Sequence, residues 1–112
     1  MDRKKELQKE YRERKIIGGV FRVVNTTNGK YLLDYTPNLQ AKQNAFNFMV
    51  TQGSCFDYKL RGDWETSGGG TFAFETLDTL VKKDIQTPEE FQNDLKTLAQ
   101  MWSEKLDPKK RY

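Results

Sequence analysis

The chain of 112 residues contains no histidine and only one cysteine, and these two absences exclude much of the usual chemistry of active sites. Without histidine there is no Ser-His-Asp or Cys-His arrangement and no histidine base that works near neutral pH. One cysteine without histidine also excludes a structural zinc site of the usual ligand types. The remaining catalytic options are carboxylates, Tyr, Lys, Arg and Mg²⁺ bound by oxygen ligands.

The chain also lacks a long hydrophobic run and a signal-like N-terminus. No stretch of about 18 apolar residues occurs, so we expect no membrane partner. The charged N-terminal residues are not followed by an apolar segment, which argues against a secretory signal. Cys55 has no second cysteine with which to form an internal disulfide, as is typical of a reducing compartment. These absences predict a cytoplasmic protein.

The residues that are present suit one small domain with an uneven charge. Apolar residues make up 36% of the chain, and seven Phe, five Tyr and two Trp supply a core. The net charge of +3 is unevenly distributed: residues 1–15 carry +3, a basic half over 16–61 carries +3 and an acidic half over 62–108 carries −6. Residues 109–111 are again basic. This asymmetry suits either a polyanion or a protein partner.

Hydrophobic periodicity and turn signals predict the order helix, strand, strand, helix, helix, strand, helix. The fold class is therefore α/β, or α+β by stricter naming, with a three-stranded antiparallel or mixed sheet flanked by helices. We expect a charged helix over 1–17, a domain over 18–108 and a basic tail over 109–112. Within the domain we expect strands over 20–24, 31–35 and 71–77, and helices from about 37 to 50, 55 to 66 and 88 to 106.

Local signals set the boundaries of these elements. Gly18-Gly19 should break the first helix, and Asn28-Gly29 predicts the tight turn of a hairpin. Thr36 before Pro37 resembles a helix N-cap. Thr87-Pro88-Glu89-Glu90 has the form of a capping box with proline at the first helical position. Alternation in the third strand places Phe72 and Phe74 on one face.

Several short patterns, taken in order, resemble the GIY-YIG nuclease family over residues 18–108. Gly19-Val20-Phe21 stands at the first signature, and Leu32-Leu33-Asp34 stands at the second, with Leu32 eleven residues after Phe21. Other similar segments are Asn28-Gly29-Lys30 between the two strands, Asn38-Leu39 at the first helix, Phe72 to Leu77, and Trp102 to Leu106. The opening M-D-R-K-K-E-L resembles that of small bacterial members that also diverge at the signature positions.

The resemblance implies a site in which two tyrosines, an arginine and an Mg²⁺-binding glutamate surround the scissile phosphate. At these positions the present chain has Phe21, Leu32, Lys42 and Ala99. Phe21 and Leu32 lack a hydroxyl, Lys42 lacks the guanidinium fork, and Ala99 cannot bind a metal. We therefore expect a catalytically degenerate member with no cofactor. Mg²⁺ would be needed only if a rearranged site, with Glu75 as the substitute carboxylate, kept nuclease activity.

Three functions follow as hypotheses. The first is a nucleic-acid-binding module, for DNA in particular, that uses cations of the basic half. The expected contacts are Arg22, Lys30, Lys42, Lys59 and Arg61. The second is a protein-interaction or regulatory domain, with a protein partner or a second copy of the chain. The third is an Mg²⁺-dependent endonuclease with a rearranged site. Glu75 as a solvated or ion-paired strand residue and Lys42 as an exposed helix lysine are the simpler interpretations of those two residues.

Overall fold

The computed structural model describes residues 15–112, so most of the charged helix expected over 1–17 lies outside the described residues. By Ile17 the chain is already in a strand. The strands are β1 (Ile17–Asn25), β2 (Tyr31–Thr36) and β3 (Phe72–Val81). The helices are α2 (Leu39–Gln52), α3 (Arg61–Ser67) and α4 (Pro88–Lys105), with short 3₁₀ turns over 58–60, 69–71 and 108–110.

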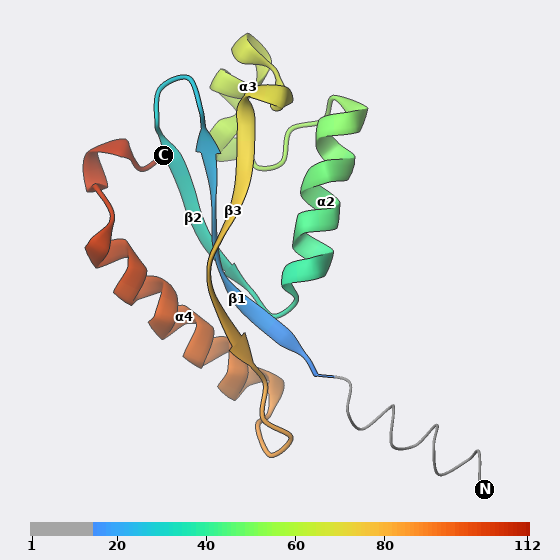
Figure 1. The fold of residues 1–112 in the computed structure, drawn as a ribbon, viewed down its shortest axis with the longest axis vertical. Coiled ribbons are helices and arrows are strands. Elements are labelled where there is room, and N and C mark those ends of the chain that lie inside the picture. Colours follow the sequence, from blue (N-terminus) through green and yellow to red (C-terminus); the bar gives the residue numbers. More distant parts are fainter. Residues whose placement is uncertain (1–14) are drawn as a thin grey trace, which may run out of the picture.

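The three strands form one antiparallel sheet in the order β2-β1-β3. The hairpin between β1 and β2 is confirmed: Gly29 turns the chain at φ 76°, and its N–H donates to the Asn25 carbonyl at 2.8 Å. The Asn28 side chain accepts from the N–H of Lys30 at 2.9 Å. Across residues 15–112, the class is therefore α+β, with a three-stranded antiparallel sheet and helices on both faces (Figure 1).

The sequence suggested that Gly18 and Gly19 end a helix, but both glycines belong to β1. A Cβ atom on Gly18 would lie 2.6 Å from the Thr36 carbonyl oxygen and 2.9 Å from the Phe91 ring. A Cβ on Gly19 would overlap the Asp78 carbonyl oxygen. These glycines therefore let neighbouring strands and α4 approach the central strand closely.

Strand β3 extends four residues beyond its predicted end at Leu77. The register shifts between Val20 and Phe21, because Val20 pairs with Asp78 whereas Phe21 pairs with Thr76. This bulge on β3 allows pairing to continue to Val81, opposite Ile17. The local alternation ends at Leu77, before the charged Asp78, and so could not reveal this continuation.

Each face of the sheet has its own hydrophobic core. Phe21, Val23, Leu32 and Phe72 pack on the side of α2 and α3. On the opposite side, α4 covers the sheet, as Figure 1 shows. The core beneath α4 contains Val20, Tyr31, Leu33, Leu98 and Trp102. The chain is thus a three-layer arrangement with β1 buried at its centre.

Helix boundaries follow the capping chemistry, with two corrections. Asn38, not Thr36, is the N-cap of α2, since its side chain accepts from the N–H of Ala41 at 3.0 Å. The helix expected over 55–66 is instead a 3₁₀ turn followed by α3, because the Asp57 side chain caps the turn at Lys59. The capping box at Thr87 and Glu90 is confirmed.

No helix within residues 15–112 has both the length and the apolar character needed to cross a membrane.

Candidate functional site

The four positions that correspond to the family's catalytic residues do not gather at one open site. Phe21 is fully buried, and its ring stacks on Phe74 with 4.8 Å between centroids. Leu32 is 4% exposed in the same core. Lys42 lies on α2, with its Nζ 5.5 Å from the ring centroid of Phe56. Ala99 lies across the sheet on α4, packed against the other core.

The substitute carboxylate Glu75 is engaged in an ion pair. Its Oε2 accepts from Nε of Arg22 at 2.8 Å, and both side chains are partly exposed. Alternation from Phe74 places Glu75 on the α4 face of the sheet. The ion-paired reading of Glu75 is therefore confirmed, and the same contact takes Arg22 out of the set of unpaired cations.

The remaining cations of the predicted interface are dispersed. Arg61 pairs with Glu65 at 3.1 Å on the exposed face of α3. The Nζ of Lys30 lies 5.8 Å from the ring centroid of Tyr112, near the hairpin turn. Of the five cations expected to contact nucleic acid, Lys59 lines a cleft that also contains cations the sequence did not single out.

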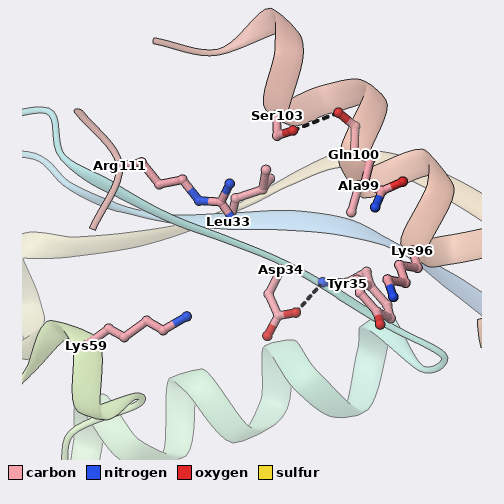
Figure 2. Close-up of a pocket in the computed structure, with 9 residues that line it drawn as sticks. All are labelled: Leu33, Asp34, Tyr35, Lys59, Lys96, Ala99, Gln100, Ser103 and Arg111. Atoms are coloured by element: carbon pink, nitrogen blue, oxygen red, sulfur yellow. Dashed lines mark hydrogen bonds between the residues drawn. The ribbon is translucent and has the colours of Figure 1, made fainter. Parts of the chain in front are cut away.

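That cleft has a volume of about 250 Å³ and lies beside β2, which forms one edge of the sheet. Figure 2 shows side chains entering it from β2, from the turn before α3, from α4 and from the C-terminal segment. The lining residues are Leu33, Asp34, Tyr35, Lys59, Lys96, Ala99, Gln100, Ser103 and Arg111. The cleft therefore joins segments that are far apart in the sequence.

Positive charge dominates this cleft. Lys59, Lys96 and Arg111 are all exposed, and no ion pair within residues 15–112 involves any of them. Asp34 is the one carboxylate of the lining, which gives three cations against one anion. Its Oδ1 accepts from the N–H of Tyr35 at 2.8 Å, as the dashed line in Figure 2 shows. This excess of positive charge favours an anionic ligand.

Neutral polar groups complete the lining. Gln100 and Ser103 lie on α4, and the hydroxyl of Ser103 donates to the carbonyl of Gln100 at 2.7 Å. The half-buried ring of Tyr35 lies beside Lys96 (Figure 2). These side chains can form hydrogen bonds or apolar contacts next to the cations, so the cleft can hold more of a ligand than its charged group.

The C-terminal residues 109–112, expected as a basic tail, are attached to the sheet. The N–H of Tyr112 donates to the Tyr31 carbonyl at 2.9 Å, and Arg111 forms a parallel bridge with Tyr31. The side chains of Lys109, Lys110 and Arg111 are exposed, as expected of a basic segment, whereas Tyr112 is half-buried. Arg111 of this segment thus lines the cleft.

A polar network holds Tyr112. Its hydroxyl donates to Oδ2 of Asp63 at 2.6 Å, and Asn25, which is 1% exposed, donates to the Tyr112 oxygen at 3.1 Å. The hydrogen bond from Tyr112, with a second from Asn28, lowers the pKa of the Asp63 carboxyl. Burial, together with the bond to Asp63, raises the pKa of the Tyr112 hydroxyl.

Sequence reasoning missed two of the three cations of the cleft. Lys96 was one charged residue among many on the exposed side of α4, and Arg111 belonged to a segment expected to be solvated. The signal available for Arg111 was the basic run Lys109-Lys110-Arg111, but nothing in the run indicated where it docks. Ala99 also lines the cleft. The sequence singled it out for another reason, namely that it stands at the metal-binding position of the family that the chain resembles, where alanine cannot bind a metal.

Within residues 15–112, no group of three or more Asp, Glu, Cys or His side chains is placed to hold a metal ion. Searches with the whole chain against protein-family models, curated proteins and solved structures find no match, so the family resemblance stays a prediction.

Proposed function

We propose that this chain is a nucleic-acid-binding module that holds the phosphate backbone, of DNA in particular, in the cleft beside β2. The observation that carries the proposal is the convergence of Lys59, Lys96 and Arg111 on one cleft from three separate segments. Lysine and arginine are among the side chains that contact phosphate oxygens. Three cations along an exposed strand edge would contact the phosphate backbone in a way that does not depend on base sequence.

The lining also supports a phosphodiester, rather than a simple anion, as the proposed ligand. Tyr35, Gln100 and Ser103 provide a ring and neutral hydrogen-bonding groups next to the cations. Such groups suit the sugar and base that accompany each phosphate. Asp34 repels phosphate but can accept from an amino or hydroxyl group of the same ligand.

The proposal includes the origin of the scaffold: a GIY-YIG-like nuclease fold that has lost its catalytic groups. In support, the hairpin comes first, two helices follow, and a third strand precedes the last helix. Phe21 and Leu32 are packed as core residues. A side chain that contributes to the core has no need of a reactive hydroxyl, which suits a protein that binds without cutting.

A salt-titrated binding assay tests the function. Fluorescence anisotropy with labelled single-stranded and duplex DNA, and with RNA, should show affinity that falls steeply between about 50 and 200 mM NaCl. In the double variant Lys59→Ala/Lys96→Ala we expect the slope of log K against log salt to become shallower by about 1.5, since each lost phosphate contact removes about 0.7–0.9.

The matched control is Lys82→Ala/Lys83→Ala, which removes the same charge from the segment between β3 and α4. This variant should keep the slope of the wild-type chain. Equal slopes for the two double variants, or no binding of any of these nucleic acids at about 50 mM NaCl, would reject the proposal.

A second candidate, a protein-interaction domain, is favoured by the free outer edge of β2. Within residues 15–112 this strand pairs with β1, and on its other side only Tyr31 is bridged, by Arg111. An extended acidic segment could add as a strand next to Leu33 and Tyr35. This candidate ranks second because the N–H of Tyr35 already donates a hydrogen bond to the Asp34 side chain, so it is not free to pair with an added strand. Binding of an acidic peptide that persists at about 500 mM NaCl would favour it, because main-chain pairing resists salt.

A further inference from the structure

The C-terminal strap, defined as residues 107–112, crosses from the end of α4 to the edge of β2. It makes one 3₁₀ turn over Pro108–Lys110 and then runs beside Tyr31. The Tyr31 hydroxyl donates to the carbonyl of Asp107 at 2.9 Å, so one residue of β2 holds the strap at both its ends. Arg111 lies between these two points of attachment.

The side chain of Tyr112 provides a further attachment of the strap. Its hydroxyl donates to Asp63 at 2.6 Å, and the buried Asn25 donates to it. Its ring packs against the core on the α3 side, 6.5 Å from the Phe72 ring centroid. Oδ2 of Asp63 accepts three hydrogen bonds, from Tyr112, from Asn28 at 3.2 Å and from Asn25 at 3.3 Å.

The orientation of Arg111 follows from that attachment. In an extended backbone, successive side chains point to opposite sides. Since Tyr112 points toward α3, the preceding side chain points away from it, and Arg111 indeed lies next to Leu33 in the cleft (Figure 2). No ion pair within residues 15–112 holds the guanidinium itself, so its place depends on the main chain of the strap.

We propose that Tyr112 is a positioning residue of the nucleic-acid site: by docking on Asp63 and Asn25, it holds Arg111 in the phosphate-binding cleft. This inference rests on the proposed function and adds that the basic cleft is complete only when the strap is docked. With the strap undocked, ordering even one residue at the moment of binding lowers affinity by roughly five- to thirty-fold, which offsets what the Arg111 contact contributes, so that contact is not made.

A double-mutant cycle tests this coupling. Arg111→Ala, Tyr112→Ala and the double variant are compared with the wild-type chain by salt-titrated anisotropy. We expect each single variant to bind roughly five- to thirty-fold more weakly and to lose about 0.7–0.9 from the salt slope. Because both changes remove the same contact, the double variant should bind no more weakly than Arg111→Ala.

Two additional measurements separate positioning from loss of structure. Tyr112→Phe keeps the ring but not the donor to Asp63, so its affinity should lie between those of the wild-type chain and Tyr112→Ala. Circular dichroism identifies the temperature range in which every variant is folded, and all affinities are measured within that range. A merely destabilised variant that is still folded would keep the wild-type salt slope.

The outcomes distinguish this inference from the proposed function. If the wild-type chain binds no nucleic acid, the proposed function fails and this inference fails with it. If the wild-type chain binds and Tyr112→Ala has the same affinity and salt slope, the inference alone is overturned. Additive losses in the double variant would overturn it as well, because Tyr112 would then act independently of Arg111.

Discussion

At the residue scale, the hydrogen bond between Tyr112 and Asp63 makes two titrations depend on folding. The pKa of Asp63 is lowered from its ordinary 3.8, and the largest cause is the hydrogen bond from Tyr112. The pKa of Tyr112 is raised from its ordinary 10.0, and the largest cause is burial. An acid whose pKa is lowered by folding stabilises the folded chain at pH values above its pKa in the unfolded chain, and this stabilisation is lost as pH falls. An acid whose pKa is raised by folding stabilises the folded chain at pH values below its pKa in the unfolded chain, and this stabilisation is lost as pH rises.

This linkage leads to a test with Tyr112→Phe. Between about pH 5 and pH 9, the melting temperature of the wild-type chain should exceed that of the variant by a constant amount. The difference should shrink as pH falls below the ordinary 3.8 of the Asp63 carboxyl, where the unfolded chain binds the proton more readily than the folded chain, and as pH rises above the ordinary 10.0 of the Tyr112 phenol, where the unfolded chain loses the proton more readily. Thermal unfolding followed by circular dichroism measures both. A difference that stays constant from acid to alkali would contradict the role of this bond.

At the element scale, two glycines illustrate opposite demands on the backbone. Gly18 lies in β1 where the Thr36 carbonyl and the Phe91 ring leave no room for a Cβ. Gly62 lies in α3, and a Cβ there would meet nothing within 4 Å. Glycine is needed for close approach at the first position, whereas at the second it only weakens a helix.

Substituting alanine at each of these glycines gives a matched pair of variants. Gly18→Ala should lower the free energy of unfolding by about 1–3 kcal/mol, because the strands and α4 must move apart. Gly62→Ala should raise it by about 0.5–1 kcal/mol through helix propensity. Urea titration measures both free energies. Equal effects of the two substitutions would show that close packing at Gly18 does not limit stability.

At the scale of the whole molecule, the groups that the family resemblance requires for hydrolysis are replaced or engaged elsewhere. Phe21 and Leu32 form core contacts, and Glu75 is paired with Arg22. We therefore expect no cleavage of plasmid, single-stranded DNA or RNA at micromolar protein with Mg²⁺ or Mn²⁺. Gel electrophoresis after incubation measures this. Cleavage that Glu75→Ala abolishes would instead establish a rearranged nuclease site.

Within residues 18–108 the sequence by itself determined the order of strands and helices, because the signals for them are local. Asn28-Gly29 specifies the hairpin turn, and Thr87 to Glu90 specifies the start of α4, through contacts within a few residues. The choice of fold class followed from these signals and from the hydrophobic pattern. The C-terminal segment was predicted as basic, and its lysine and arginine side chains are indeed exposed.

Only the tertiary structure decided where the chemistry-bearing side chains meet. Arg22 and Glu75 are 53 residues apart and pair across adjacent strands, and Tyr112 reaches Asp63 over 49 residues. No local pattern encodes such contacts, because they depend on strand order, on the bulge in β3 and on how the strap packs. For the same reason Lys59, Lys96 and Arg111 form one cleft only in the folded chain, whereas Ala99 and Phe21 lie on opposite faces of the sheet.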